Sequence, residues 1–221
     1  MNGLLSALAD VVFPPVCVHC RGLVEDSGFR SLCACCAREI VPAGGPPERP
    51  GPDQAFGRGC AAVMSRGPAR ALVIELKYHR GLHVLADMGE VFRKSAAVVE
   101  CARGSILVPV PLHPRKLRER GFNQSALLAE ALAAAAGGGA TLAHLLRRTV
   151  DTPTQTALDR PGRRANLKNA FALAGGRRLD PRQHYILVDD VFTTGSTLDS
   201  CARVLRRAGC LNLDVITFGH G

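Results

Sequence analysis

Residues 185–198 have the sequence Tyr-Ile-Leu-Val-Asp-Asp-Val-Phe-Thr-Thr-Gly-Ser-Thr-Leu. The apolar residues 185–188 indicate a buried β-strand, and the residues from Thr197 onward have the spacing of a helix. Because the carboxyl ends of strands line the ligand crevice of an open parallel sheet, we expect Asp189 and Asp190 where a substrate binds. Two adjacent carboxylates repel each other, so the pair requires a compensating cation or hydrogen-bond donors, for example Mg2+ or the hydroxyls of a sugar.

The loop after the aspartates carries four hydroxyl side chains around one glycine: Thr193, Thr194, Gly195, Ser196 and Thr197. Its backbone amides stand at the start of the expected helix, where the helix macrodipole favours anions. The loop lacks Gly-Lys and the Gly-x-Gly-x-x-Gly spacing, so it is neither a Walker loop nor a dinucleotide-binding turn. A ribose 5-phosphate fits better, with the carboxylates on the ribose hydroxyls. An ordinary turn is the alternative, but turn chemistry explains neither the paired acids nor the run of hydroxyls.

Strand and helix patterns alternate along the chain from Phe56 onward. Strands are expected at residues 106–110, 185–188 and 213–218, and helices at residues 68–77, 125–136 and 197–208. Asn123 precedes the second of these helices and Gly137 follows it, as is typical of helix caps. Strands that alternate with helices predict a mainly parallel sheet flanked by helices, so we expect an α/β fold.

Five of the nine cysteines fall between residues 17 and 36. They include two Cys-x2-Cys pairs, Cys17 with Cys20 and Cys33 with Cys36. Two such pairs complete the tetrahedral sulfur shell of a structural zinc site, which has no open position for a water molecule. Cys35 could replace Cys36 as a ligand, although the repeated spacing favours Cys36. Redox-active or merely buried thiols are the alternative.

Residues 1–55 differ from the rest of the chain in charge and composition. They hold 4 basic and 6 acidic residues, whereas residues 56–221 hold 24 and 13, so the second part requires an anionic partner. Apolar residues at helical spacing between Leu4 and Val12 predict a short amphipathic helix, and five Pro and three Gly within residues 41–53 predict a linker. We therefore expect a small N-terminal zinc-binding domain over residues 1–55 and an α/β domain over residues 56–221.

Composition excludes several classes of protein. With 47% hydrophobic and 21% charged residues the chain can bury a core, which excludes a disordered protein. No apolar run reaches the ~18 to 20 residues that cross a bilayer, so no membrane span is expected. The N-terminus has no basic segment and carries Asp10 within its apolar part, unlike a secretory signal. A cytoplasmic location is expected.

Together with further motifs, these features resemble the ComF family. The aspartate pair and its loop resemble the phosphoribosyl pyrophosphate (PRPP) motif of type I phosphoribosyltransferases. The other matching motifs are the two cysteine pairs, Leu76-Lys77-Tyr78, Pro109-Val-Pro-Leu-His113-Pro-Arg115, Arg120-Gly-Phe-Asn123-Gln124 and Thr152-x2-Gln155-x7-Arg163-x2-Asn166. The resemblance implies a type I phosphoribosyltransferase-like domain with a zinc-binding head and, for many members, a role in DNA uptake during natural transformation or in the use of external DNA.

The resemblance also implies roles for single residues. Asp189 and Asp190 would contact the ribose hydroxyls and Mg2+, and residues 193–197 would surround the 5-phosphate. Pyrophosphate would bind after an earlier strand, at residues 112–115, where positive charge comes from Arg115, Arg118 and Arg120. A solvated basic helix end is the alternative for these arginines.

A hood over PRPP is implied for residues 147–171. Six basic and no acidic residues fall between residues 160 and 179, and the positions that match the family are Thr152, Gln155, Arg163 and Asn166. Closure of such a hood would exclude water from a reactive sugar cation, whereas a solvated basic loop is the alternative. Lys77 and Tyr78, near the end of a helix, are further candidates for the ligand crevice.

Two classes of function are compatible with the sequence. The first is an enzyme that displaces pyrophosphate from PRPP with the help of Mg2+, although neither an acceptor pocket nor a general base can be identified. The second is a non-catalytic module that uses the same loop and basic surface to bind a nucleotide or single-stranded DNA, with DNA-uptake proteins as partners. The first predicts release of pyrophosphate, and the second predicts salt-dependent DNA binding.

Overall fold

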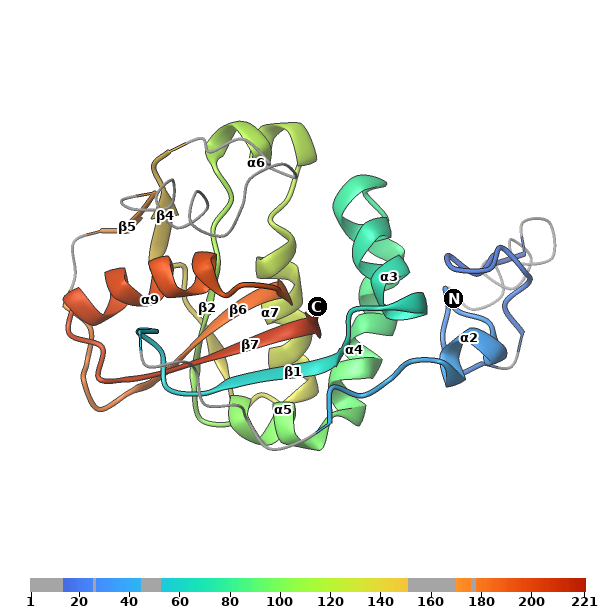
Figure 1. Cartoon of the computed structure of the whole chain (residues 1–221), viewed down its shortest axis with the longest axis horizontal. Helices are drawn as coiled ribbons and strands as arrows, with labels where there is room; N and C mark the ends of the chain where they lie inside the picture. The colour runs from blue at the N-terminus through green and yellow to red at the C-terminus, as the bar shows by residue number, and fades with distance from the viewer. Residues whose placement is uncertain (1–13, 26, 45–52, 151–169, 176–177) are drawn as a thin grey trace, which may run out of the picture.

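The computed structural model describes residues 14–25, 27–44, 53–150, 170–175 and 178–221 (Figure 1). Its centre is a five-stranded sheet with the order β1-β7-β6-β2-β3, in which every neighbouring pair is parallel. The strands are β1 (Gly59–Met64), β2 (Ile106–Pro109), β3 (Thr141–Leu142), β6 (His184–Phe192) and β7 (Asn212–His220). A separate antiparallel pair is formed by β4 (Leu146–Arg148) and β5 (Phe171–Leu173).

Helices cover both faces of the sheet. They are α3 (Gly67–Tyr78), the 3-10 helix η1 (Leu82–Val84), α4 (Leu85–Lys94), α5 (Ala96–Ala102), α6 (Pro114–Arg120), α7 (Gln124–Ala135) and α9 (Ser196–Arg207), with the short α2 (Ala34–Arg38) in the head. Among the described residues, no helix combines the length and apolar composition that a membrane span requires.

Strand β6 is buried on both faces. Ile186 and Val188 join one core cluster with α3, α4, α5 and α7. Tyr185 and Leu187 join the second cluster with α9 and β5. Because successive side chains of a strand point to opposite faces, burial on both sides explains the continuous apolar run in the sequence. The predicted fold class, a mainly parallel sheet flanked by helices with a small cysteine-rich head, is confirmed.

The elements expected from the sequence are present with small shifts of their ends. Helix α7 is capped as predicted, because Asn123 Oδ1 accepts a hydrogen bond from the Ser125 amide at 3.2 Å. Strand β6 is longer than predicted and continues through both aspartates to Phe192, which pairs with His220 of β7. The expectation that the aspartates follow the strand was wrong, since the neighbouring strand continues alongside them.

The cysteine-rich head lies at one end of the molecule and contacts α4 (Figure 1). Leu32 is fully buried and belongs to the same apolar cluster as Met88 of α4. The carboxylate of Asp87, also in α4, accepts hydrogen bonds from the amides of Arg30 at 2.8 Å and Ser31 at 2.7 Å. A buried carboxylate of one element therefore holds the backbone of the other. The helix predicted near the N-terminus lies outside the described residues.

The Pro- and Gly-rich segment is attached to the sheet domain at both ends. The carbonyl of Val41 accepts from the Met64 amide at 2.8 Å, and Pro42 forms a bridge with Val63 of β1. At the other end, Arg203 Nη2 of α9 donates to the Asp53 carbonyl at 2.6 Å. These bonds fix where the segment leaves the head and where it enters the second part of the chain.

Candidate functional site

The two aspartates lie beside an open edge of β6. Its pairing with β2 ends where Pro109 pairs with Val188, although its pairing with β7 continues to Phe192. The start of α7 occupies the space beyond the end of β2, so its first side chains face the acid pair. Asp190 is only 5% exposed. The order of the strands therefore places the acid pair at the carboxyl end of the sheet, as expected.

Both carboxylates are compensated by groups of the chain itself. Ser125 Oγ donates to Asp189 Oδ1 at 2.8 Å, and the Asp190 amide donates to the same oxygen at 2.9 Å. Lys77 Nζ lies 2.9 Å from Asp190 Oδ1, and Gln124 Nε2 donates to Asp190 Oδ2 at 3.1 Å. The chain itself thus supplies the cation and the hydrogen-bond donors that two adjacent carboxylates require. We call these five residues the acid-pair network.

Within this network, the carboxyl group of Asp189 has an unusual pKa. Burial raises the pKa of Asp189 to about 7, and the neighbouring charge of Asp190 acts in the same direction. The hydrogen bond from Ser125 and the charge of Lys77 act in the opposite direction and are outweighed. An acid with such a pKa changes its charge near neutral pH, which is a frequent property of functional sites.

Residues 193–197 form a turn that leads from β6 into α9. Gly195 immediately precedes α9 and has φ +71°, a left-handed conformation that glycine adopts without strain. In the described part of the chain, no acceptor is found for the backbone amides of Thr193, Thr194, Gly195 and Thr197. The Ser196 amide makes only a long contact, 3.4 Å, with Thr194 Oγ1. The loop therefore keeps amide donors at a helix start, where an anion is favoured.

Of the arginines expected near pyrophosphate, Arg120 contacts one member of the acid-pair network. Its Nη1 donates to Gln124 Oε1 at 2.5 Å, and Gln124 donates in turn to Asp190, so one amide side chain connects a guanidinium to a carboxylate. Arg115 and Arg118 are exposed on α6, and Arg115 Nε donates to Glu119 Oε1 at 2.9 Å.

Several expectations concern residues at the edge of the site or beyond it. Lys77 lies in the network, as the sequence suggested, whereas the neighbouring Tyr78 is 65% exposed. The described strands β4 and β5 flank the segment expected to form the hood. Four of its positions, Thr152, Gln155, Arg163 and Asn166, lie outside the described residues.

Sequence reasoning assigned no role to Gln124 or Ser125. Both follow Asn123, which caps α7, and the cap fixes the direction in which they leave the helix start. A signal was present, since Gln124 belongs to a matched motif that begins at Arg120. The motif alone did not reveal the contact of Gln124 with the aspartates. That contact depends on the strand order, because α7 starts beside the aspartates only if β2 and β6 are neighbours in the sheet.

A second site lies in the head. The sulfur atoms of Cys17, Cys20, Cys33 and Cys36 all lie within 4.8 Å of one another, with 3.6 Å between Cys20 Sγ and Cys33 Sγ. Four sulfurs at about 2.3 Å from a tetrahedral zinc ion are about 3.8 Å apart, so the group fits zinc. Cys35 is exposed and outside the group.

The thiols of this group differ in pKa. Burial raises the pKa of Cys17, but hydrogen bonds from nearby backbone amides outweigh it and lower the pKa to about 6. Metal binding requires the thiolate form. Burial raises the pKa of Cys36, another member of the group, so the donor set and the spacing, rather than the pKa of one thiol, make the head fit a metal ion such as zinc.

Comparison with known proteins gives several relatives. DNA utilization protein YhgH from Salmonella typhi is 32% identical over 91% of this chain and 95% of the relative, and YhgH from Salmonella typhimurium is 34% identical over the same shares. Competence protein F from Haemophilus influenzae is 39% identical over 49% of this chain and 47% of its own length. No protein-family model matches the chain.

The solved structures found are distant. A hypoxanthine phosphoribosyltransferase from Staphylococcus aureus has a TM-score of 0.37 and 14% identity over 60% of this chain and 62% of that chain. A glutamine PRPP amidotransferase from B. subtilis has a TM-score of 0.38 and 17% identity over 60% of this chain and 26% of that chain. The family of this chain is therefore established by the two YhgH relatives, which match nearly the whole chain.

Proposed function

Because this chain belongs to the ComF family, we propose that it binds PRPP, or a related 5-phosphorylated ribose or nucleotide, together with Mg2+. The relatives are named for competence and for DNA utilization, and these names support a role in DNA uptake or in the use of external DNA. In this proposal residues 56–221 carry the ligand site. Residues 1–55 form a separate domain whose four cysteines hold a structural zinc ion.

One observation carries the proposal: three kinds of ligand-binding group meet at the carboxyl end of β6. The carboxylates of Asp189 and Asp190 suit the ribose hydroxyls, the amides of residues 193–197 suit the 5-phosphate, and Arg120 suits the pyrophosphate. Gln124 joins the guanidinium to the acid pair at 2.5 and 3.1 Å, which fixes the spacing between two of the three groups.

The acid pair also fits Mg2+ in its chemistry. Mg2+ prefers oxygen ligands and is usually held by one or two carboxylates together with phosphate oxygens and water. Asp189 and Asp190 provide the carboxylates, and the phosphorylated ligand provides the rest. The ion would neutralise part of the pyrophosphate charge, while Arg120 binds the same group from the side of α6.

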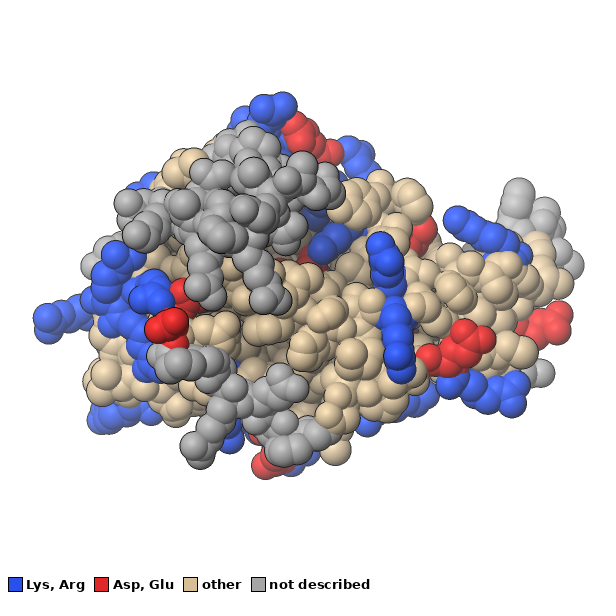
Figure 2. Space-filling model, viewed as in Figure 1, with Lys and Arg blue, Asp and Glu red and all other residues tan. Residues whose placement is uncertain are grey.

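A second candidate function is binding of single-stranded DNA by the same loop together with the basic surface of the molecule. Lys and Arg side chains gather over α6 and over the C-terminal end of α9 (Figure 2), and Arg115 and Arg118 on α6 are exposed. Exposed cations of this kind contact nucleic-acid phosphates without reading sequence.

Calorimetry with PRPP and Mg2+ tests the first proposal. The double variant Asp189→Asn, Asp190→Asn should bind PRPP weaker by a factor on the order of ten or more, because the amides cannot replace charged acceptors for the hydroxyls and the ion. Asp180→Asn is the control, since it removes a carboxylate paired with Arg182 on the surface. A wild-type chain that does not bind PRPP at millimolar concentration contradicts the proposal.

The same variants separate the two candidate functions. Loss of two negative charges leaves single-stranded DNA binding unchanged or stronger, and that binding should weaken steeply with salt. A transfer reaction is recognised by pyrophosphate release from PRPP in the presence of bases or ammonia.

A further inference from the structure

Lys77 supplies a positive charge to the acid pair. It lies in the last turn of α3, and its Nζ is 2.9 Å from Asp190 Oδ1. The side chain of Asp190 is 7% exposed and that of Lys77 is 23% exposed. In the described part of the chain, no other ammonium or guanidinium forms an ion pair with either aspartate. A nearly buried carboxylate is thus neutralised by one ammonium group.

Of the four oxygens of the pair, two besides the one contacted by Lys77 accept hydrogen bonds, and in the described part of the chain Asp189 Oδ2 has no partner. Asp190 Oδ2 accepts from Gln124, and Asp189 Oδ1 accepts from Ser125 and from the Asp190 amide. A divalent cation that binds Asp190 would approach the oxygen contacted by Lys77, at a metal to oxygen distance of about 2.1 Å. An ammonium 2.9 Å from that oxygen and a divalent ion on it would repel each other strongly.

We propose that Lys77 is the resident counter-cation of the acid pair, and that a divalent cation binds there with high affinity only when an anionic group of the phosphorylated ligand takes over the Lys77 ammonium. This inference rests on the function proposed above. It makes the binding of the cation and of the phosphorylated sugar mutually dependent, since each removes the obstacle to the other.

The surroundings of Lys77 allow this exchange. Its ammonium ends a flexible stem, and the side chain is partly exposed, so the ammonium can turn towards an incoming phosphate group. The end of α3 is held independently, because Leu76 is buried in the core and the Gly81 amide donates to the Glu75 carbonyl at 3.1 Å. The side chain can therefore move while the helix end stays beside the site.

Titration of the zinc-loaded full-length chain with Mn2+, followed by the paramagnetic resonance of the free ion, tests the inference. Lys77→Met should bind Mn2+ alone more tightly than the wild type by a factor on the order of ten, because the competing charge is gone. Addition of PRPP should tighten Mn2+ binding to the wild type by a similar factor and have a much smaller effect on the variant. Lys94→Met is the matched control, since Lys94 pairs with Glu90 on α4.

The outcomes separate this inference from the proposed function. Equal Mn2+ affinity of the wild type and Lys77→Met overturns the counter-cation role, whether or not PRPP binds. A wild type that does not bind PRPP overturns the proposed function and the dependence on the ligand, while higher Mn2+ affinity of the variant would still support the counter-cation. Lys77→Arg keeps the charge and should behave as the wild type; Mn2+ binding as tight as in Lys77→Met would contradict the electrostatic account.

Discussion

At Gly195, both the backbone conformation and the close packing disfavour a side chain. Its φ is +71°, and a Cβ there would lie 2.9 Å from the Phe192 ring and 3.0 Å from Gln54 Nε2. Gly195→Ala should lower the free energy of unfolding by about 1 to 3 kcal/mol, because it adds a steric contact to the left-handed strain. Urea denaturation measures the change.

Gly137→Ala isolates the conformational part of that cost. Gly137 has φ +69°, yet nothing lies within 4 Å of the position of its Cβ. Its substitution should therefore cost only the strain of the left-handed backbone, about 1 kcal/mol. Equal losses in the two variants would show that the Phe192 ring and Gln54 move aside, and that the loop before α9 is less tightly packed than the structure indicates.

Between elements, one carboxylate of α4 supplies hydrogen-bond acceptors to the head. Asp87 is 2% exposed and accepts from the amides of Arg30 and Ser31. Asp87→Ala leaves two amides without their acceptor and should destabilise the chain by about 2 to 4 kcal/mol. Hydrogen exchange of those amides should become faster. The zinc content should stay at that of the wild type, because no ligand is changed, and its loss would instead show that Asp87 maintains the metal site.

Elements with strong local signals could be predicted, and contacts between distant elements could not. Helix α7 was predictable because Asn123 and a glycine run mark its two ends. The full length of β6 was not, because two charged residues interrupt its apolar pattern and only pairing with β7 continues it. The ion pair of Lys77 with Asp190 depends on where α3 ends relative to β6, which is a property of the sheet order.

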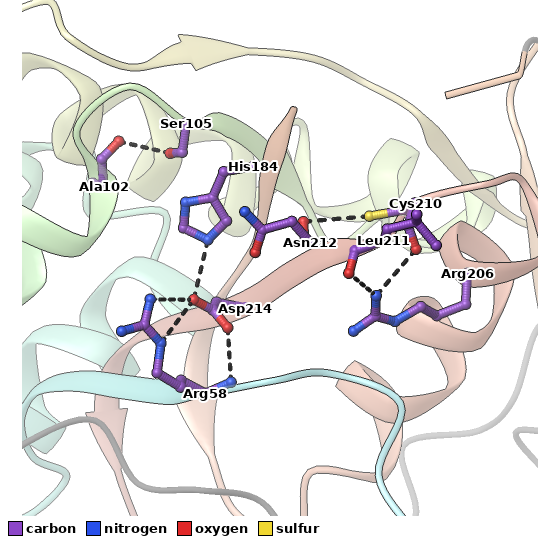
Figure 3. Close-up of polar contacts among 9 residues, drawn as sticks. All are labelled: Arg58, Ala102, Ser105, His184, Arg206, Cys210, Leu211, Asn212 and Asp214. Carbon is purple, nitrogen blue, oxygen red and sulfur yellow. Dashed lines mark hydrogen bonds and ion pairs between the residues drawn. The ribbon is translucent and has the colours of Figure 1, made fainter. Parts of the chain in front are cut away.

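Across the whole molecule, the two ends of the sheet carry different groups of polar residues. The carboxyl ends carry the acid pair and its loop, whereas the amino ends of β1, β6 and β7 are joined around Asp214 (Figure 3). Arg58, directly before β1, donates its amide at 2.8 Å and its Nη2 at 2.9 Å to this carboxylate. His184 Nε2 of β6 lies 3.1 Å from the same carboxylate. One buried acid thus connects three strands at the end of the sheet opposite to the acid pair.

This arrangement makes stability depend on pH in a defined direction. Burial raises the pKa of Asp214, but the bonds from His184 and Arg58 outweigh it, so the pKa lies below the ordinary 3.8. As pH falls, the carboxyl of Asp214 takes up its proton in the unfolded chain first. The stabilisation by Asp214 is therefore complete above about pH 5 and is lost as pH falls through the lowered pKa of the folded chain. Asp214→Asn, which does not titrate, should be less stable than the wild type by about 2 to 4 kcal/mol at neutral pH.

Urea denaturation of both chains between pH 7 and pH 3 measures this difference. It should stay constant down to about pH 5 and shrink below pH 4, where the unfolded chain binds a proton that the folded wild type does not yet take up. Loss of a metal from the head at low pH affects both chains equally and cancels in the difference. If the difference in stability between the two chains stayed constant to pH 3, Asp214 would act through the shape and packing of its side chain. Its charge would then contribute little to the junction of the three strands.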